Sequence, residues 1–424
     1  MIRLLDRSKI GWFNYFYIFC MLIYAGNATV FVRQLGDLST IGNAFGILIT
    51  IFFWFKNKIR LGQPYYISIA VFLFYAIITS VNNKMINPRW ITEWIIWLTM
   101  AYGICQAFKE RLFVVVESVL YQLCIIALVF WGIHLIIPDE MPEIVKAIQF
   151  SKPYEEECNV YANMIFYTVN SMQGSVGEEF RLFLRNAGFA WEPGAFSCMI
   201  CLGIFSNILR TNFSLRNRSL WVFLLALLST QSTTGLSIML LLVVAWLILN
   251  KKYRYLFLVV PVVIAAFNLP FVKDKIIFEI EISQYKDISD SYGAQGRLFS
   301  LQLDFEEFLR HPIIGLGGYS KGTWLAQNGY EIATISGIGN MLVTFGAIMT
   351  ALFIGLLIKS CQVIQSVVRS NNAWFLLIVI LGMMFSYGLW KQPIFIAFWM
   401  FGVYCSEIVS RKGVLNANNS IVVS

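Results

Sequence analysis

The chain has 424 residues, of which 58% are hydrophobic and 13% charged, and its mean hydropathy is +0.68. A soluble chain carries about 25% charged residues, so this composition excludes a soluble enzyme. The apolar residues form blocks of roughly twenty, the length that a membrane-spanning helix requires. The net charge of +8 does not indicate nucleic-acid binding, because most basic residues lie in short loops on one side of the predicted spans.

The apolar segments are interpreted as membrane spans in chain order. They cover residues 10–26, 39–55, 65–80, 91–108, 112–137, 193–209, 219–233, 235–249, 254–272, 336–358, 373–390 and 392–408. The first is predicted to stay uncleaved, since Gly26-Asn27-Ala28 is at best a weak cleavage site. We therefore predict an all-α polytopic membrane protein, one integral membrane domain over residues 1–424 with about twelve transmembrane helices.

Lysines and arginines orient these spans. Their clusters are Arg3, Arg7 and Lys9; Lys56, Lys58 and Arg60; Lys109 and Arg111; Arg210, Arg216 and Arg218; Lys251, Lys252 and Arg254; Lys359 and Arg369; and Arg411 and Lys412. If the spans alternate in direction, all of these clusters fall on one side, which the positive-inside rule identifies as the cytoplasm. Both termini are then cytoplasmic, and two long loops, residues 138–185 and 273–335, lie outside.

The first long loop leads into a mid-chain span through a polar segment. Arg181 and Arg185 precede Glu192-Pro193, and a helix is predicted to begin at Pro193. Proline lacks a backbone N–H, and it suits the first helical turn because N–H groups there have no partner within the helix. Glu192 then lies at the helix N-terminus, where the helix dipole favours negative charge. Arginines beside such a helix end make a candidate anion site. The simpler alternative is a proline-defined helix start with a capping carboxylate.

The segment 219–249 is too long for one ordinary span. Both of its flanks are basic, so the chain must return to the side of the membrane on which it entered. We predict two short helices that meet at the polar run 229–235, which includes Ser232 and Thr233. Polar backbone facing lipid is unfavourable, so this turn is either buried in protein or lines a watery cavity. A closed helix hairpin without a ligand and a cavity lining both remain open.

The second long loop contains a predicted amphipathic helix that begins at Arg297. Its apolar stripe is suited to lying on the membrane surface or to packing on the bundle. The stripe consists of Leu298, Leu301, Phe305, Phe308 and Leu309. His311 and the proline after it end the helix, and a glycine-rich segment then turns the chain. His311 is a candidate base, or it caps the last helix carbonyls.

Other titratable residues give weaker signals. His134 lies in an apolar span and is interpreted as a satisfied interior residue. Glu93 and Glu117 lie near the ends of spans, where a carboxylate is either functional or reaches to the interface. The sequence has no metal-ligand cluster, no phosphate-binding loop and no nucleophile elbow, so we expect neither a metal nor another cofactor.

Three motifs together resemble the bacterial O-antigen polymerase and ligase superfamily, which assembles lipid-linked polysaccharides. The first is R-x-x-G-x-x-x-E-P, which ends at Pro193, and the second is the helix headed by Arg297 with the H-P-I-I-G-L-G that follows it. The third is Gly339-Asn340 with LVTFGAI. The resemblance covers roughly residues 180–360 and implies a GT-C-like glycosyltransferase in the bacterial cytoplasmic membrane.

One departure distinguishes the chain from the ligases of this superfamily. Those ligases typically carry a histidine just before an asparagine, near the end of the second long loop. Here that place is Gly339-Asn340, and no histidine occurs from Lys321 to Asn340. The Glu192-Pro193 pair is more typical of the polymerases, so the resemblance favours an oligosaccharide repeat unit polymerase.

The resemblance implies a glycosyl transfer on the external face. A glycan on undecaprenyl diphosphate would move to a sugar hydroxyl of another lipid-linked repeat unit, which builds O-antigen, capsule or exopolysaccharide. The diphosphate leaving group needs charge stabilisation, which suits Arg185 and Arg297, with Arg181 beside them. The acceptor hydroxyl needs a base or an oriented acceptor, for which Glu192 is the first candidate and His311 the second.

The same resemblance names further expected contacts. Ser232, Thr233 and Asn340 are expected to line the cavity, and membrane lipid and a chain-length regulator protein are the expected partners beside the lipid-linked oligosaccharide. An O-antigen ligase or a lipid-linked oligosaccharide flippase is the alternative function. Against a flippase stand the long outer loops with their arginines and the lack of a visible repeat between the halves.

Overall fold

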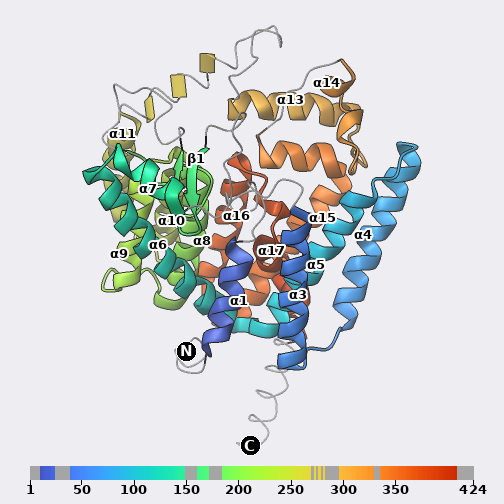
Figure 1. Ribbon diagram of the computed structural model, residues 1–424, viewed down its shortest axis with the longest axis horizontal. Helices are drawn as coiled ribbons and strands as arrows, with labels where there is room; N and C mark the ends of the chain where they lie inside the picture. Colours follow the sequence, from blue (N-terminus) through green and yellow to red (C-terminus); the bar gives the residue numbers. More distant parts are fainter. Residues whose placement is uncertain are drawn as a thin grey trace, which may run out of the picture.

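The computed structural model describes residues 10–23, 39–148, 160–170, 184–268, 272–273, 276–277, 280–281, 296–328 and 335–407. Within these ranges the chain is almost entirely helical, with one antiparallel hairpin (Figure 1). The α-helices are α1 (Trp12–Ile23), α3 (Ser39–Asn57), α4 (Gln63–Asn82), α5 (Pro88–Phe108), α6 (Leu112–Ile136), α7 (Glu140–Ile148), α8 (Pro193–Thr211), α9 (Arg218–Thr230), α10 (Thr233–Leu249), α11 (Leu256–Phe267), α13 (Arg297–Arg310), α14 (Trp324–Gln327), α15 (Gly337–Val368), α16 (Phe375–Ser386) and α17 (Pro393–Tyr404). The strands are β1 (Val160–Met164) and β2 (Tyr167–Asn170), and the short 3-10 helices are η5 (Lys109–Arg111), η8 (Tyr253–Tyr255), η10 (Ser320–Gly322), η11 (Asn371–Trp374) and η12 (Leu389–Lys391).

Each predicted span overlaps one of these helices, so the all-α class of the membrane region is confirmed. Four described helical stretches are long and apolar enough to cross a membrane by length and composition: Gln63–Asn82, Pro88–Ile136, Pro193–Thr211 and Gly337–Val368. The second of these joins α5 and α6 through a turn at Lys109, where φ is 48°. The other apolar helices have 10–17 residues, so a count of about twelve crossings stays a prediction.

The helices run between two opposite ends of a bundle (Figure 1). At one end, the Lys56 ammonium lies 4.1 Å from the Phe13 ring centroid, and Asn372 donates to Asn212 at 2.8 Å. Among the described residues, the links that carry predicted cytoplasmic lysines and arginines, such as η5, also lie there, so we call it the basic end. The opposite end, where α8, α10 and α17 begin, is called the loop end.

The centre of the bundle is α8, whose residues from Pro193 to Leu209 are all buried. It packs against α6, α9, α10 and α16. At the edge, α4 keeps large apolar side chains such as Phe74 and Val81 exposed. A helix that is apolar all round belongs inside a bundle, whereas an exposed apolar face suits lipid, so this gradient fits an integral membrane protein.

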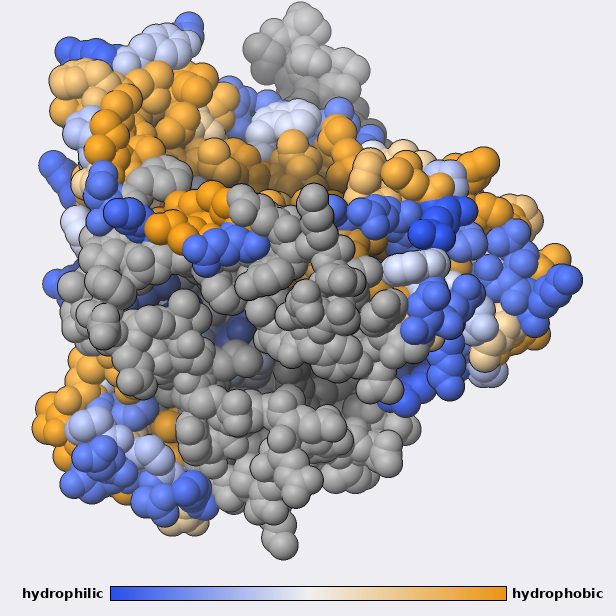
Figure 2. All heavy atoms as spheres, turned by 90° about the horizontal axis from the view of Figure 1, so that it is seen from above, coloured by the Kyte–Doolittle hydropathy of each residue, from blue (hydrophilic) through white to orange (hydrophobic). Residues whose placement is uncertain are grey.

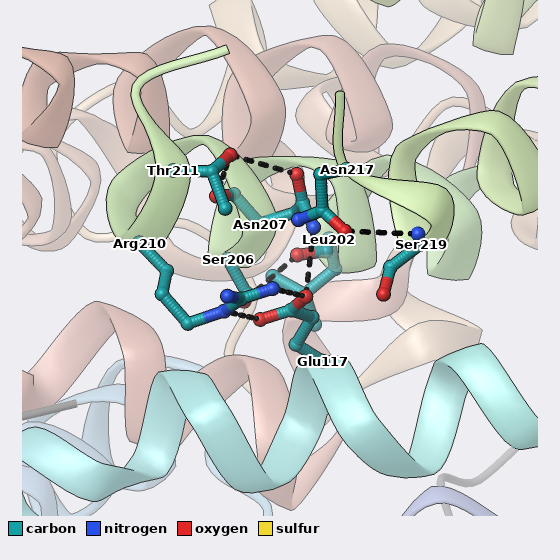
Figure 3. Close-up of polar contacts among 8 residues, drawn as sticks. All are labelled: Glu117, Leu202, Ser206, Asn207, Arg210, Thr211, Asn217 and Ser219. Carbon is teal, nitrogen blue, oxygen red and sulfur yellow. Dashed lines mark hydrogen bonds and ion pairs between the residues drawn. The ribbon is translucent and has the colours of Figure 1, made fainter. Parts of the chain in front are cut away.

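At the basic end, a buried carboxylate joins α6 to α8 (Figure 3). Both oxygens of Glu117 accept from Arg210, at 2.7 Å from Nε and 2.6 Å from the terminal nitrogen, and Asn207 Nδ2 donates to the same group at 2.7 Å. The Glu117 side chain has no exposed surface. The alternative that Glu117 reaches to the interface is therefore wrong, because the arginine comes to the carboxylate inside the protein.

The first long loop contributes α7 and the β1–β2 hairpin, which share a small apolar core. Its members include Met141, Val145 and Tyr167. The Tyr167 hydroxyl is 2.9 Å from His134 Nδ1, so His134 is a satisfied interior residue as predicted. The Thr168 amide donates to the Gly188 carbonyl at 2.8 Å, which ties the hairpin to the segment before α8.

The helix α15 is broken at Gly346, where φ is 63° and ψ is −174°. The glycine-rich segment after α13 fills the break. The amides of Leu316 and Gly317 donate to the Val343 and Thr344 carbonyls at 2.8 Å each, and the Pro312 carbonyl accepts from Ala347 at 2.8 Å. A break in a membrane helix is tolerated where other groups form hydrogen bonds with the backbone N–H and C=O groups that the break leaves open. The predicted span 336–358 is thus two helical pieces rather than one.

The first piece of α15 lies beneath α13 at the loop end (Figure 1). The inward face of α13 holds Phe299 and Leu303 together with two acidic residues, Asp304 at 4% and Glu307 at 6% exposed. Three residues of the predicted stripe point outward, with Leu298 44%, Phe305 48% and Leu309 58% exposed. Of the two alternatives for this stripe, packing on the bundle is therefore wrong for these three residues, and lying on the membrane surface stays a prediction. The buried Glu307 carboxylate accepts a hydrogen bond from the Trp324 amide at 2.7 Å, so the protein supplies its partner.

Candidate functional site

The candidate site begins at the N-terminus of α8. Pro193 occupies the first helical turn as predicted, and Glu192 is the N-cap residue with extended backbone, φ −150° and ψ 159°. Within α8 itself, every residue of which is described, the Glu192 carboxylate makes no capping hydrogen bond. The alternative of a capping carboxylate is thus wrong.

Tyr387, the residue that follows α16, lies within electrostatic reach of the Glu192 carboxylate. The Tyr387 hydroxyl lies 2.9 Å from a terminal nitrogen of Arg297, whose guanidinium carbon is 5.3 Å from the Tyr387 ring centroid. Arg297 is the first residue of α13, as the sequence predicts. The Tyr387 hydroxyl therefore contacts one of the predicted phosphate-binding arginines and lies within electrostatic reach of the predicted base.

A separate set of contacts fixes Arg185. Its Nε donates to the Thr230 carbonyl at 3.0 Å. The next residue, Asn186, is buried and donates to the Ser229 hydroxyl at 3.0 Å. Gly188 adopts φ +52°, and a side chain there would meet the Phe196 ring at 2.7 Å. The segment before α8 is therefore fixed both to the α9–α10 turn and to α8.

The α9–α10 turn is where the sequence places it, between Thr230 and Thr233. Ser232 is buried, caps α10 through the Gly235 amide and accepts a hydrogen bond from Ser197 of α8 at 2.9 Å. Thr234 is 2.6 Å from Ser386, the neighbour of Tyr387. The turn is thus buried in protein, and Ser232 has structural partners. Thr233 is half-buried, and its role as a cavity-lining residue stays a prediction.

The inward face of α13 adds a second polar group. An ideal side-chain carbon at Gly339 would lie 2.3 Å from Asp304 Oδ2, so α13 and α15 are in direct contact there. Burial lowers the pKa of the Lys391 ammonium, and the carboxylates of Glu93 and Asp304 counteract that shift. The Asn340 side-chain oxygen is buried and has no hydrogen-bond partner within the described residues. It remains a candidate contact for a ligand.

His311 lies at the opposite end of α13 from Arg297. A helix of fourteen residues is about 20 Å long, so the structure separates the two candidate bases. His311 Nε2 is 3.9 Å from the buried Glu307, whose other oxygen accepts from the Trp324 amide at 2.7 Å. Arg181 falls outside the described residues. Of the predicted site residues, Arg297 therefore contacts Tyr387 and Glu192 lies within electrostatic reach of it, whereas Arg185 is bound to the α9–α10 turn.

Sequence reasoning missed Tyr387, Asp304 and Lys391. A tyrosine at the end of an apolar segment is typical of the aromatic belt at a membrane interface, so nothing in FSYGLW singles out Tyr387. Asp304 is one carboxylate among several in α13, and Lys391 occupies a short loop. A helical wheel gives one signal, since Asp304 and Arg297 are seven residues apart and share a helix face.

Seen from above, the loop end carries hydrophilic side chains at the right, where Figure 1 places α14 and the upper end of α4 (Figure 2). Within the described parts of the chain, no group of three or more His, Cys, Asp or Glu side chains could hold a metal ion. The chemistry that these described residues offer is one carboxylate and two guanidinium groups. Such a set can take up a proton and hold an anion.

The comparison with protein families finds one match. Residues 219–341 match the family described as O-antigen ligase, and they contain Arg297, His311 and Asn340, whereas Arg185 and Glu192 precede them. No curated protein sequence matches the chain. The family match confirms the resemblance to the O-antigen polymerase and ligase superfamily.

Proposed function

We propose that this chain, a member of the O-antigen polymerase and ligase superfamily, polymerises oligosaccharide repeat units carried on a polyprenyl diphosphate. The observation that carries the proposal is that Arg297 contacts the Tyr387 hydroxyl at 2.9 Å, while the Glu192 carboxylate acts electrostatically on the same hydroxyl. A carboxylate can accept the proton of an attacking hydroxyl, and a guanidinium can stabilise an anionic leaving group. The two groups therefore support a transfer reaction that needs both.

In this reaction the acceptor sugar oxygen attacks the anomeric carbon of the donor glycan. The new bond forms between that oxygen and that carbon, and the bond from the carbon to the diphosphate oxygen breaks. Glu192 accepts the proton of the acceptor hydroxyl. The diphosphate leaves with its electron pair and stays on the lipid, so the step needs no oxidant and no nucleotide.

The diphosphate needs positive charge close to its oxygens as the bond breaks. Arg297 supplies it from the N-terminus of α13, and Arg185 supplies it from the segment before α8. A guanidinium offers paired N–H groups that match two phosphate oxygens. Glu192 is preferred to His311 as the base, because the length of α13 separates His311 from Arg297.

The second candidate is an O-antigen ligase, which the description of the matched family favours. A ligase breaks the same bond but transfers the glycan to a different lipid acceptor. The sequence Gly339-Asn340 lacks the histidine that such ligases typically carry. The polymerase therefore remains the first proposal.

A strain without this protein separates the candidates. We expect its surface lipid to carry single repeat units and no long chains, because flipping and ligation do not depend on a polymerase. Loss of all surface units, with lipid-linked units trapped inside, would contradict the proposal in favour of a flippase. Long chains that accumulate on the carrier would contradict it in favour of a ligase.

A further inference from the structure

We propose that Tyr75 of α4 is a positioning residue for Arg297, an inference that rests on the proposed glycosyl transfer. Tyr75 acts through residues 312–318, the segment after α13, which we call the inserted segment. This segment begins two residues after the end of α13, so its position fixes the C-terminal end of that helix. Tyr75 needs no contact with the substrate, because it acts on the reaction through the placement of α13.

The inserted segment replaces part of the hydrogen bonding of α15. At the Gly346 break, it binds two carbonyls and two amides that a continuous helix would pair with each other. The four hydrogen bonds run from Leu316 N to Val343 O and from Gly317 N to Thr344 O at 2.8 Å each, from Ala347 N to Pro312 O at 2.8 Å, and from Ile348 N to Ile313 O at 3.3 Å. The end of α13 therefore cannot move without breaking bonds that α15 needs.

Tyr75 joins the two sides of this break. Its side chain is buried, and its hydroxyl donates to the Ile314 carbonyl at 2.9 Å and to the Thr344 carbonyl at 2.6 Å. A phenol has one proton, so the two carbonyls share it. One carbonyl belongs to the inserted segment and the other to α15, so this one hydroxyl holds the two together.

Two asparagines at the corner between α4 and α5 hold the same segment. Asn83 Nδ2 donates to the Leu316 carbonyl at 2.9 Å, and Asn87 Nδ2 donates to the Gly318 carbonyl at 2.7 Å. A side-chain carbon at Gly318 would lie 2.5 Å from the Trp90 ring of α5, so the segment also packs closely on that helix. Three side chains of the α4–α5 pair therefore bind three carbonyls of the inserted segment.

The length of α13 makes Arg297 sensitive to these contacts. The helix has fourteen residues, with Arg297 at the end opposite the inserted segment. A rotation of about 5° around the fixed end of a helix about 20 Å long moves the other end by about 2 Å. That displacement would break the 2.9 Å contact between Arg297 and Tyr387. A misplacement of about 1 Å in a reacting geometry can cost about a hundredfold in rate.

The first test is Tyr75→Phe, which keeps the ring and removes the hydroxyl. The probe is an undecaprenyl-diphosphate-linked repeat unit, and rates are measured per folded protein after size-exclusion chromatography. We expect kcat to fall about tenfold, with KM changed by less than about twofold, because Arg297 is needed most as the leaving group gains charge. The matched control is Tyr65→Phe on the same helix, whose hydroxyl lies 3.0 Å from Thr99 of α5. It should leave kcat unchanged.

A merely structural role for Tyr75 predicts a different result. It would lower the melting temperature of Tyr75→Phe and leave kcat per folded protein as it was, which would overturn the proposal.

The second test combines Tyr75→Phe with Arg297→Ala. If Tyr75 acts by placing the guanidinium, its hydroxyl has nothing left to place once that group is removed. Adding Tyr75→Phe to Arg297→Ala should then change the residual kcat by less than about twofold. Losses that multiply in the double variant would overturn the proposal, because they would mean that the two residues act independently.

The third test measures the position of α13 without any reaction. In a variant without native cysteines, one spin label is attached at Ile136→Cys, at the end of α6, and the second at either Leu298→Cys or Leu309→Cys. All three side chains are exposed. Pulsed electron paramagnetic resonance gives the two distance distributions. Tyr75→Phe should widen the distribution to residue 298 by about 2 Å more than the distribution to residue 309.

The proposed function and the positioning role fail differently in these experiments. If the unaltered protein does not lengthen the lipid-linked repeat unit, the proposed function fails, and the distance measurement still decides whether Tyr75 holds α13 in place. If the protein is active and Tyr75→Phe changes neither kcat nor the distances, only the positioning role is overturned.

Discussion

At the residue scale, the first prediction concerns the arginines. Arg185→Lys and Arg297→Lys should each lower the rate of chain growth about tenfold or more, and alanine at either place about a hundredfold. A lysine carries the charge, but it cannot donate two parallel hydrogen bonds to a diphosphate. The rate is measured with purified protein, and thermal unfolding checks that each variant is folded. Full activity in a lysine variant would contradict the paired contact.

Glu117 gives a prediction about stability rather than activity. Glu117→Ala leaves the partly buried Arg210 without its carboxylate partner, so it should destabilise the protein by up to about 3 kcal/mol. The double variant Glu117→Met/Arg210→Met removes both charges and should lose much less. Thermal unfolding in detergent measures both. Glu143→Ala is the matched control, since it breaks an exposed 2.7 Å pair with Lys146 and should change stability by less than about 1 kcal/mol. Equal losses in all three variants would contradict the buried pair.

Residue identity alone predicted part of the site. Glu192-Pro193 identified the start of α8, because proline suits a first helical turn, and Arg297 identified the start of α13. Tyr387 could not be predicted, because its hydrogen-bond partner Arg297 is 90 residues away in the chain. A pairing of this kind is decided by the packing of three helices and leaves no local pattern.

At the scale of one element, α15 shows what periodicity misses. The segment LVTFGAI looks like an ordinary apolar span with one glycine, and the sequence predicts no break. The break exists because Leu316 and Gly317 supply donors for carbonyls that the helix leaves open. The sequence also left the orientation of α13 open between the membrane surface and the bundle. Amphipathic spacing identifies two faces but does not tell which one the bundle buries.

The break gives the third prediction. A side-chain carbon at Gly346 would lie 2.5 Å from the Ile313 carbonyl oxygen, and the residue has φ +63°. Gly346→Ala should therefore destabilise the protein by about 2 kcal/mol or more, measured by thermal unfolding. Gly355→Ala lies on the same helix with nothing within 4 Å, and it should stabilise by up to about 1 kcal/mol. A tolerated Gly346→Ala would mean that α15 is continuous.

At the scale of the whole molecule, charge decides orientation. The alternation of basic clusters predicts that the basic end faces the cytoplasm, and the clusters among the described residues, such as the one in η5, lie at that end. The fold alone does not select the side, since no contact within the protein depends on it. The order of the helices was predictable because hydropathy is a local property, whereas the number of crossings depends on how short helices such as α16 sit in the bilayer.

Cysteine labelling tests this orientation. In a variant without native cysteines, Lys321→Cys at the loop end should react with an impermeant maleimide in intact cells from which the outer barrier is removed. Lys251→Cys at the basic end should react only after lysis. Both lysines are exposed, so access to the reagent depends on the side of the membrane. The reverse pattern would invert the topology.

The central claim is that this protein transfers glycans between two lipid-linked repeat units. Its most direct measurement is a reconstitution in which purified protein receives one undecaprenyl-diphosphate-linked repeat unit and no other acceptor. We predict a ladder of lengthened glycans, with one free undecaprenyl diphosphate released for each unit added, and loss of both products in Glu192→Gln. An unchanged pool of single units, with transfer only after another lipid acceptor is supplied, would contradict polymerisation.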